Sequence, residues 1–211
     1  MLHAVSNDWS GYLTEGTNFT FVAASWRVPA VTCTTADSRV SFWVGLSGHA
    51  SPTIQQDGTG AVCHAGVPRY GMWWEMYAST GSSGHTFYPV SPGDYISAYV
   101  RYDAAGYTLH VEDRTNGVHF TVVEACNDDD QCNRNSAQWI VERPGGGKYA
   151  LANYATFAFV GAQATDDSAS GTITAFQDQR ILMEHAGTKL SEAGPLTPDG
   201  SGFTTTWLAD E

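Results

Sequence analysis

The sequence predicts an all-β fold built from two packed antiparallel sheets. Short runs rich in Val, Tyr, Phe, Trp and Thr recur along the chain, separated by Gly, Pro, Asp and Asn. Patterns with the period of a helix are almost absent. Many short strands at regular spacing are typical of a two-sheet β-sandwich.

The strands are expected, in chain order, near residues 9–13, 19–27, 40–46, 70–78, 95–102, 107–113, 118–124, 137–142, 154–160, 171–176, 180–184 and 203–208. Two polar segments, 103–106 and 114–117, separate three consecutive strands. The second contains Asn116-Gly117, a pair favoured in tight hairpins. An antiparallel meander is therefore expected between residues 95 and 124.

A single domain spanning residues 1–211 is expected, because all-β folds of this length often form one domain. Segment 143–149, Arg-Pro-Gly-Gly-Gly-Lys-Tyr, interrupts the strand pattern. It could be a linker between domains or a loop beside a cleft. Strand-like sequence continues on both sides without a change in composition, which favours the loop.

The composition supports a folded, acidic protein. Apolar residues make up 42% of the chain and charged residues 15%, so a core can form without a signature of disorder. Asp and Glu number 22 against 10 Lys and Arg, a formal net charge of -12 at pH 7. Such a surface repels nucleic acids and anionic membranes, so neither is expected as a partner. The sequence pI near 4.8 is compatible with an acidic environment.

The four cysteines are expected to form disulfides. Their spacing is not the paired C-x-x-C of a structural zinc site. Cys126 and Cys132 bracket a polar run that a short bridge could close, which leaves Cys33 to pair with Cys63. Secretion is therefore expected, with any leader already removed from a chain that begins Met1-Leu2-His3. We expect a monomer without metal or cofactor.

Several common catalytic signatures are missing. The pattern G-x-S-x-G fails in segment 45–49, where His49 replaces the last glycine. The sequence H-E-x-x-H is absent, and His110 with Glu112 is more consistent with a solvated strand face than with a metal site. Neither Asp-Thr-Gly nor Asp-Ser-Gly occurs. These observations disfavour serine hydrolases of the α/β type, zinc peptidases and paired-aspartate peptidases.

Strand alternation groups carboxylates with aromatic residues. Trp73, Glu75 and Tyr77 point to one side of their strand. In segment 138–142, Gln138 and Glu142 share the face opposite Trp139. The simplest interpretation of this second segment is that Trp139 faces the core while Gln138 and Glu142 face water.

Six separated motifs, read together, resemble the eqolisin family of glutamic peptidases over most of the chain. In order they are Trp9-Ser10-Gly11-Tyr12, Trp26-Arg27-Val28-Pro29, Trp43-Val44-Gly45, Gln55-Gln56-Asp57-Gly58, Trp73-Trp74-Glu75-Met76-Tyr77 and Ala137-Gln138-Trp139-Ile140-Val141-Glu142. The resemblance implies two bent antiparallel sheets of the concanavalin-like or jelly-roll type, with a substrate cleft across the concave sheet. It also implies hydrolysis of polypeptide substrates at low pH, insensitive to inhibitors of paired-aspartate peptidases.

The resemblance assigns site residues as well. Gln56 is implied as the catalytic amide and Glu142 as the catalytic carboxylate. The spacing to Gly58 selects Gln56 over its neighbour Gln55. The implied substrate-binding residues are Trp9, Gly11, Trp43, Trp73, Glu75, Tyr77 and Gln138, whereas Trp26 and Trp139 are expected in the core.

Two positions depart from the family pattern. Relatives usually read Ala-Glu-Trp-Ile-Val-Glu, so Gln138 stands at the first acidic position and only Glu142 retains a carboxylate. Ser47 stands where relatives often have an aspartate. If the first acid were the essential one, the chain would be an inactive relative.

A glutamine and a glutamate can together hydrolyse an amide without a covalent intermediate. An ionised Glu142 would take a proton from water, and the Gln56 amide would stabilise the oxyanion. With an ordinary pKa near about 4.3, Glu142 would be partly ionised at acidic pH. The alternative is a non-catalytic sandwich that binds glycans or peptides, since fold alone does not determine function.

Overall fold

The computed structural model describes residues 2–78, 82–84, 88–126 and 133–211. These residues form β-strands in two facing layers, with one short 3-10 helix, η1 (Ile173–Ala175). The first layer contains, in spatial order, β1 (Leu2–Ser6), β15 (Gln177–His185), β2 (Trp9–Glu15), β12 (Ser136–Glu142), β4 (Arg39–Ser47), β5 (Thr53–His64) and β6 (Val67–Ala78). All of these pairs are antiparallel except β1 with β15.

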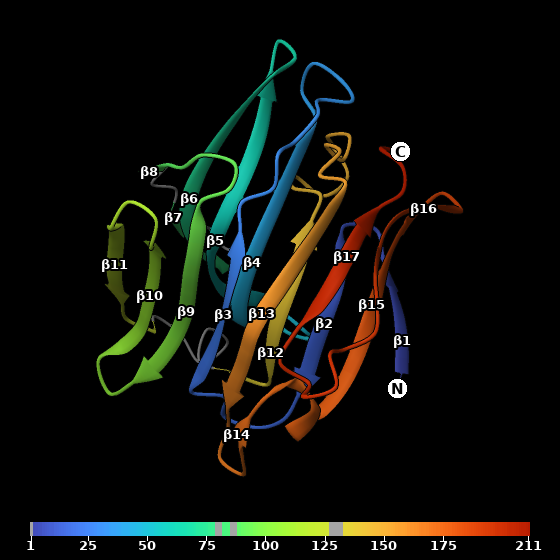
Figure 1. Ribbon diagram of the computed structural model, residues 1–211. Helices are drawn as coiled ribbons and strands as arrows, with labels where there is room; N and C mark the ends of the chain where they lie inside the picture. Colours follow the sequence, from blue (N-terminus) through green and yellow to red (C-terminus); the bar gives the residue numbers. More distant parts are fainter. Residues whose placement is uncertain (1, 79–81, 85–87, 127–132) are drawn as a thin grey trace.

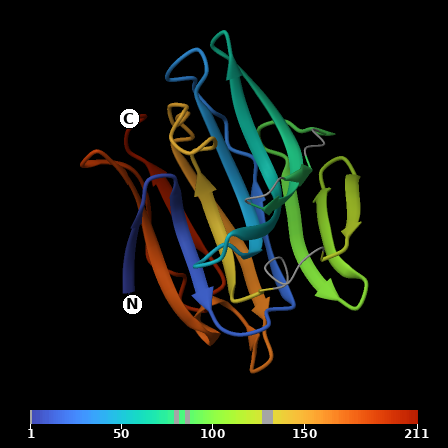
Figure 2. The same ribbon diagram turned by 180° about the vertical axis from the view of Figure 1, so that it is seen from behind.

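The second layer contains, in spatial order, β17 (Phe203–Trp207), β13 (Thr156–Thr165), β3 (Phe21–Arg27), β9 (Tyr95–Asp103), β10 (Gly106–Asp113) and β11 (Val118–Glu124). Three two-residue strands lie at the margins: β7 (Ser83–Gly84) and β8 (Tyr88–Pro89) beside β6, and β14 (Ser170–Gly171) beside β13. Figures 1 and 2 show the β10–β11 hairpin on one side of the molecule. On the other side, both chain termini lie beside the hairpin formed by β15 and β16 (Thr188–Ala193).

The two layers belong to one continuous sheet. Strand β16 (Thr188–Ala193) pairs with β15 of the first layer and with β17 of the second. Strand β13 then pairs with β17 through Thr156–Phe159 and with β3 through Val160–Thr165, across an irregularity at 160–163. The all-β expectation is confirmed, but hydrogen bonding joins the two expected sheets into one.

The main core fills the space between the layers. Trp26 on β3 and Trp139 on β12 are fully buried there, as expected. Each also makes a hydrogen bond to the opposite layer: Trp26 Nε1 to Thr59 Oγ1 on β5, and Trp139 Nε1 to the Ala23 carbonyl on β3, both at 2.9 Å. A buried indole N–H requires an acceptor, so these bonds fix how the layers face each other.

Several strand boundaries differ from the sequence prediction. The 95–124 meander is confirmed, with antiparallel pairing of β9, β10 and β11. No strand was expected at β5, whose glycines disfavour β structure. Position 58 requires glycine, because β4 passes so close that a Cβ atom would lie 2.1 Å from the Phe42 carbonyl oxygen. Strands β1 and β16 were also missed, and the strand expected at 171–176 is wrong, because β14 ends at Gly171 and η1 follows.

The disulfide between Cys33 and Cys63 is confirmed, and it links the segment before β4 to the end of β5. Cys126 is also disulfide-bonded. Its expected partner, Cys132, lies outside the described residues, so that pairing stays a prediction. In the described part of the chain, no helix is long and apolar enough to cross a membrane.

Candidate active site

The outer face of the first layer carries the cleft residues. Strand alternation sends Trp43 on β4, Gln56 on β5, Glu75 on β6 and Glu142 on β12 to the side away from the main core. Gln56 lies opposite Glu75 across the β5–β6 pair. A second, smaller apolar cluster of Leu13, Trp43, Ile54, Ile140 and Ile181 underlies this face. The functional side chains therefore stand on a rigid strand scaffold.

Two adjoining pockets meet at Gln56, Glu75 and Glu142. The first, here called the arginine pocket, has a volume of about 340 Å³ and is lined also by Arg39, Ser41, Val62, Trp73 and Pro144. The second, here called the tyrosine pocket, has a volume of about 650 Å³ and is lined also by Asp8, Trp9, Ser51, Tyr77 and Gly146. Gly145 lines both, so segment 143–149 is a loop beside a cleft, as preferred from the sequence.

Hydrogen bonds fix the central carboxyl and amide groups. Trp43 donates its indole N–H to Oε2 of Glu142 at 2.7 Å. Gln56 donates from Nε2 to Oε2 of Glu75 at 2.8 Å. Trp43 itself is fully buried and packs edge-on against Trp9, with ring centroids 5.2 Å apart. Trp43 lines neither pocket, so the structure does not support the predicted substrate contact, and Trp43 is a positioning residue beneath Glu142.

Burial raises the pKa of Glu142 to about 7. Hydrogen bonds from Trp43 and Trp9 act in the opposite direction, because they stabilise the ionised form. The nearby negative charges of Glu75 and Asp8 raise the pKa of Glu142 further. The expectation that Glu142 titrates near the ordinary glutamate value is wrong, because the surrounding strands and tryptophans leave its carboxyl little contact with water.

The predicted site residues are not all brought to the cleft. Trp9, Trp73, Glu75 and Tyr77 line it. Gly11 is instead packed against β12, where a Cβ atom would lie 2.1 Å from the Trp139 carbonyl oxygen. This close approach, rather than substrate contact, accounts for the glycine.

Gln138 also differs from the sequence expectation. Its side chain is fully buried and lines neither pocket. It donates from Nε2 to the Ser47 carbonyl at 2.5 Å and to Ser136 Oγ at 3.3 Å. Gln138 therefore supports the turn that follows β4. Its side chain neither reaches the cleft, as the resemblance implied, nor faces water, as the simplest interpretation of the strand pattern implied.

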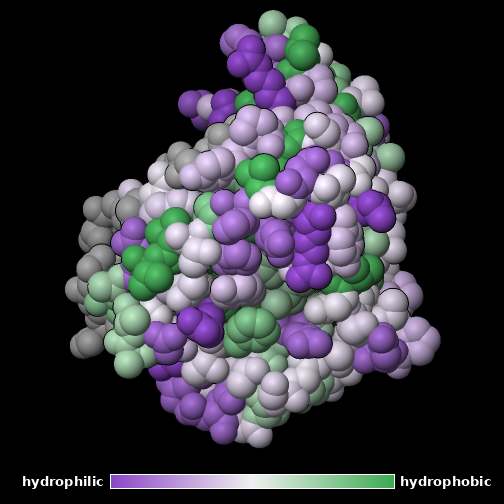
Figure 3. All heavy atoms as spheres, turned by 60° about the vertical axis from the view of Figure 1, so that its left-hand side comes forward, coloured by the Kyte–Doolittle hydropathy of each residue, from purple (hydrophilic) through white to green (hydrophobic). Residues whose placement is uncertain are grey.

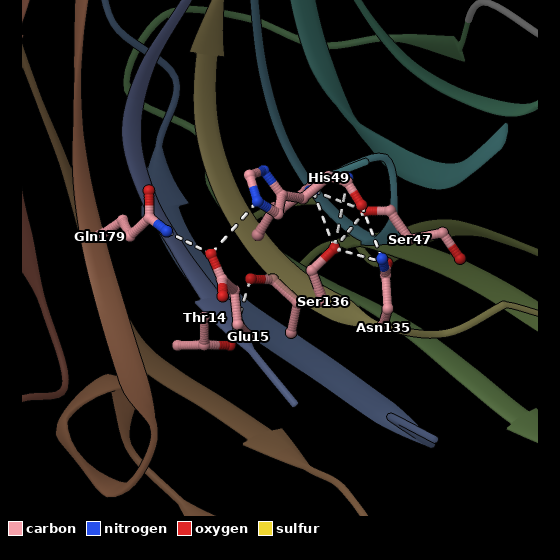
Figure 4. A network of polar contacts seen from close by, with 9 residues as sticks. Thr14, Glu15, Ser47, His49, Asn135, Ser136 and Gln179 are labelled. Atoms are coloured by element: carbon pink, nitrogen blue, oxygen red, sulfur yellow. Dashed lines mark hydrogen bonds and ion pairs between the residues drawn. The ribbon is translucent and has the colours of Figure 1, made fainter. Parts of the chain in front are cut away.

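This turn is held by the polar network of Figure 4. Ser136 Oγ donates to the Ser47 carbonyl at 2.8 Å, and Asn135 Nδ2 donates to the His49 carbonyl at 2.7 Å. His49 Nε2 lies 3.2 Å from Oε1 of Glu15, which also accepts a hydrogen bond from Gln179. Because Gly48 and Ser51 line the tyrosine pocket, the network fixes one wall of the cleft.

Sequence reasoning missed Arg39, Asp8 and Arg143. Arg39 lies two residues before Ser41, and alternation along β4 would have placed it on the same face as Trp43. Arg143 is almost fully buried, with Nε 3.5 Å from Oδ1 of Asp8. No pattern in the sequence pairs these two residues, because their contact depends on the path of the loop after β12.

Asp57 was also missed as a titrating group. It adjoins Gln56 but points into the core, where Oδ2 accepts a hydrogen bond from the His110 backbone N–H at 2.6 Å. Burial raises the pKa of Asp57 well above its ordinary value. In the described part of the chain, no three His, Cys, Asp or Glu side chains gather in a way that could hold a metal ion.

The chain matches a known family of peptidases over most of its length. Residues 7–203 match the model of the Peptidase A4 family. Aspergillopepsin-2 of Aspergillus niger is 26% identical over 228 aligned positions, covering 96% of this chain and 78% of that protein.

Solved structures match over most of the chain as well. Aspergilloglutamic peptidase from Aspergillus niger is 26% identical with a TM-score of 0.68, covering 81% of this chain and 99% of that one. Scytalido-glutamic peptidase bound to a peptide-based transition state analog has a TM-score of 0.79 at 19% identity, covering 96% and 99% of the two chains, and shares the fold. The resemblance found in the sequence is thus confirmed, and the chain belongs to the Peptidase A4 family, the eqolisin glutamic peptidases.

Proposed function

We propose that the protein is a secreted endopeptidase that works in acid, with Gln56 and Glu142 as its catalytic pair. One observation carries the assignment: the Gln56 amide and the Glu142 carboxyl face the same cleft, and Trp43 fixes the carboxyl by a 2.7 Å hydrogen bond. Gln138, the competing position, lines neither pocket. Secretion is supported by the Cys33–Cys63 disulfide, because such bonds persist in oxidising compartments.

The raised pKa of Glu142, about 7, changes the role of its carboxyl. Across the acidic range the group is protonated, so it holds both a donor O–H and an acceptor oxygen. Trp43 donates to Oε2, so this oxygen serves as an acceptor. A protonated Glu142 can therefore give one proton and take another in the same step.

In the first step, water attacks the peptide carbonyl carbon. Glu142 gives its proton to the carbonyl oxygen and takes a proton from the water, so it ends the step protonated and the carbonyl becomes a gem-diol. Gln56 uses one N–H for Glu75, and its second N–H is suited to the charge that develops on the oxygen.

In the second step, the gem-diol collapses. Glu142 gives its proton to the leaving nitrogen and takes one from a hydroxyl of the gem-diol, while the C–N bond breaks. The products are a carboxylic acid and an amine, and Glu142 returns to its starting state. No covalent intermediate forms.

The test is cleavage of a denatured protein at pH 3–4 and at pH 7, with and without an inhibitor of paired-aspartate peptidases. Cleavage in acid that resists the inhibitor is expected. Gln56→Ala and Glu142→Gln should each lower the rate by about 10²–10³-fold or more with the fold intact. Gln163→Ala and Glu112→Gln, on the other layer, serve as controls and should be fully active. Full activity of purified Glu142→Gln, or no cleavage by the wild type at any pH, would contradict the proposal.

A further inference from the structure

Arg39 is a cation in the cleft of a strongly acidic protein. It lines the arginine pocket together with Gln56 and Glu142. The chain has only 10 Lys and Arg against 22 Asp and Glu, so a positively charged side chain in the cleft is unusual for this protein. The tyrosine pocket, by contrast, is lined by Asp8 and contains no basic residue.

The guanidinium of Arg39 is held in place without being neutralised. Its Cζ lies 3.5 Å from the centre of the Tyr149 ring, a stacked arrangement that restricts its rotation. Backbone hydrogen bonds to Ala150 and Ala152 anchor the residue at the start of β4. Among the residues that the structure describes, no carboxylate forms an ion pair with Arg39, and its Nε is buried without a partner.

Strand geometry places Arg39 near the reacting bond. Ser41 lies directly opposite Glu142 across the β4–β12 pair, and Arg39 is two residues further along the same face. Two strand residues span about 7 Å. An extended peptide has a similar rise per residue, so the guanidinium lies within about two residues of the scissile bond.

We propose that Arg39 selects substrates with a carboxylate near the scissile bond, either an Asp or Glu side chain or the C-terminus of a short peptide. This inference rests on the proposed peptidase function. The planar guanidinium offers paired N–H donors that match a carboxylate, and Tyr149 presents them in a fixed orientation. Trp73 and Val62 contribute apolar walls against which the methylene groups of a glutamate side chain can pack.

The experiment compares matched peptides that carry Glu or Gln at each of the two positions on either side of the scissile bond, each with a free or an amidated C-terminus. It is run at pH 5–6, where a substrate carboxylate is mostly ionised and Glu142, with a pKa of about 7, is still mostly protonated. The wild type should cleave the preferred carboxylate peptide with a kcat/KM about 10- to 100-fold above its neutral partner. A preference for Glu over Gln identifies a side chain as the source, and a preference for the free terminus identifies the C-terminus.

Variants assign the preference to the guanidinium. Arg39→Gln should abolish it while the neutral peptides are still cleaved, and Arg39→Lys should retain only part of it. Arg101→Gln on β9, whose natural partner is Asp103, is the control and should behave as the wild type. Equal cleavage of all the peptides by the wild type, or a preference that persists in Arg39→Gln, would overturn the inference.

A binding arm separates this inference from the catalytic proposal. Glu142→Gln should bind the carboxylate peptide about 10- to 100-fold more tightly than its neutral partner in calorimetry, and the double variant Arg39→Gln/Glu142→Gln should bind both alike. If no peptide is cleaved but this difference in binding is seen, the peptidase proposal fails and the role of Arg39 stands. If peptides are cleaved without a difference in cleavage or binding, only the role of Arg39 fails.

Discussion

The indole N–H of Trp43 lies 2.7 Å from Oε2 of Glu142, joining two neighbouring strands at the centre of the cleft. Because it favours the ionised carboxyl, this bond holds the pKa of Glu142 lower than burial alone would. It also distinguishes the two carboxyl oxygens, which an isolated glutamate cannot do.

Trp43→Phe tests this bond. The pKa of Glu142 should rise because a donor to its ionised form is lost, and the alkaline limb of the activity profile should move to higher pH. The rate at the optimum should fall by about tenfold or more because the carboxyl is no longer fixed. The measurement is kcat against pH, beside Trp26→Phe as a control tryptophan in the core. A limb that moves to lower pH would contradict the role given to Trp43.

Glu75→Gln tests the charge beside Glu142. The Glu75 carboxylate raises the pKa of Glu142, so its removal should let Glu142 ionise at lower pH. If the protonated carboxyl is the active form, activity should be lost earlier as pH rises, and the alkaline limb should start below about 7. The amide of the variant can still accept from Gln56 Nε2, which keeps the geometry comparable. An unchanged limb in kcat against pH would show that Glu75 has no electrostatic role.

Asp57→Asn tests the pH dependence of stability. The folded state raises the pKa of Asp57, so its protonated form is favoured by folding. This stabilisation is fully present below the unfolded pKa of about 3.9 and is lost as pH rises towards the folded value. The wild type should therefore lose stability between pH 4 and pH 7, and the variant should lose less. Urea unfolding at both values measures the difference, and parallel losses in the two proteins would refute the role of Asp57.

Gln138→Glu introduces the acid that the family resemblance implies at this position. The new carboxyl would be fully buried and would face the Ser47 carbonyl oxygen, so it can donate only when protonated. Its folded pKa should be raised, which leaves stability near that of the wild type at pH 3–4 and lowers it at pH 7. Thermal unfolding at the two values checks this. Equal melting temperatures of the variant at both would mean that the site tolerates a buried charge.

Replacing Cys33 and Cys63 together by serine should lower the free energy of unfolding by about 3 kcal/mol, because the bridge closes a sequence separation of 30 residues. The same bridge links the segment that leads into β4 at Arg39 to the end of β5 that carries Val62. Urea unfolding of the variant beside the oxidised wild type measures the loss. A change below about 0.5 kcal/mol would indicate that the strands hold this edge without the bridge.

The sequence was most informative where side chains alternate along a strand. Trp139 and Glu142 fall on opposite faces as the pattern indicated, one in the main core and the other in the cleft. The strand that presents Gln56 could not be recognised from its composition, because Gly58 weakens β propensity and is explained only by the close approach of β4. Local pattern contains no information about such an approach.

Burial depth was the second quantity that the sequence could not supply. Gln138 and Glu142 share a face of β12, yet Gln138 is fully enclosed by the turn after β4 while Glu142 reaches the cleft. The pKa of Glu142 was misjudged for the same reason, since it depends on what the other strands place around the carboxyl.

The surface in Figure 3 shows hydrophobic side chains in separate patches among hydrophilic ones. Small apolar patches of this kind are normal on the face of a folded protein. The expected monomer stays a prediction, and sedimentation of the active protein would test it.

Strand β13 belongs to the chain of strand pairings that joins the two layers. Its first half pairs with β17, which β16 joins to β15 of the first layer, and its second half pairs with β3, so unfolding either layer removes hydrogen-bonded partners of the other. Scanning calorimetry should therefore give one transition, and limited proteolysis of the native chain should release no stable half. Many paired strands are distant in sequence, as in the pairing of β1 with β15. The chain is therefore expected to fold slowly, over milliseconds to seconds or longer.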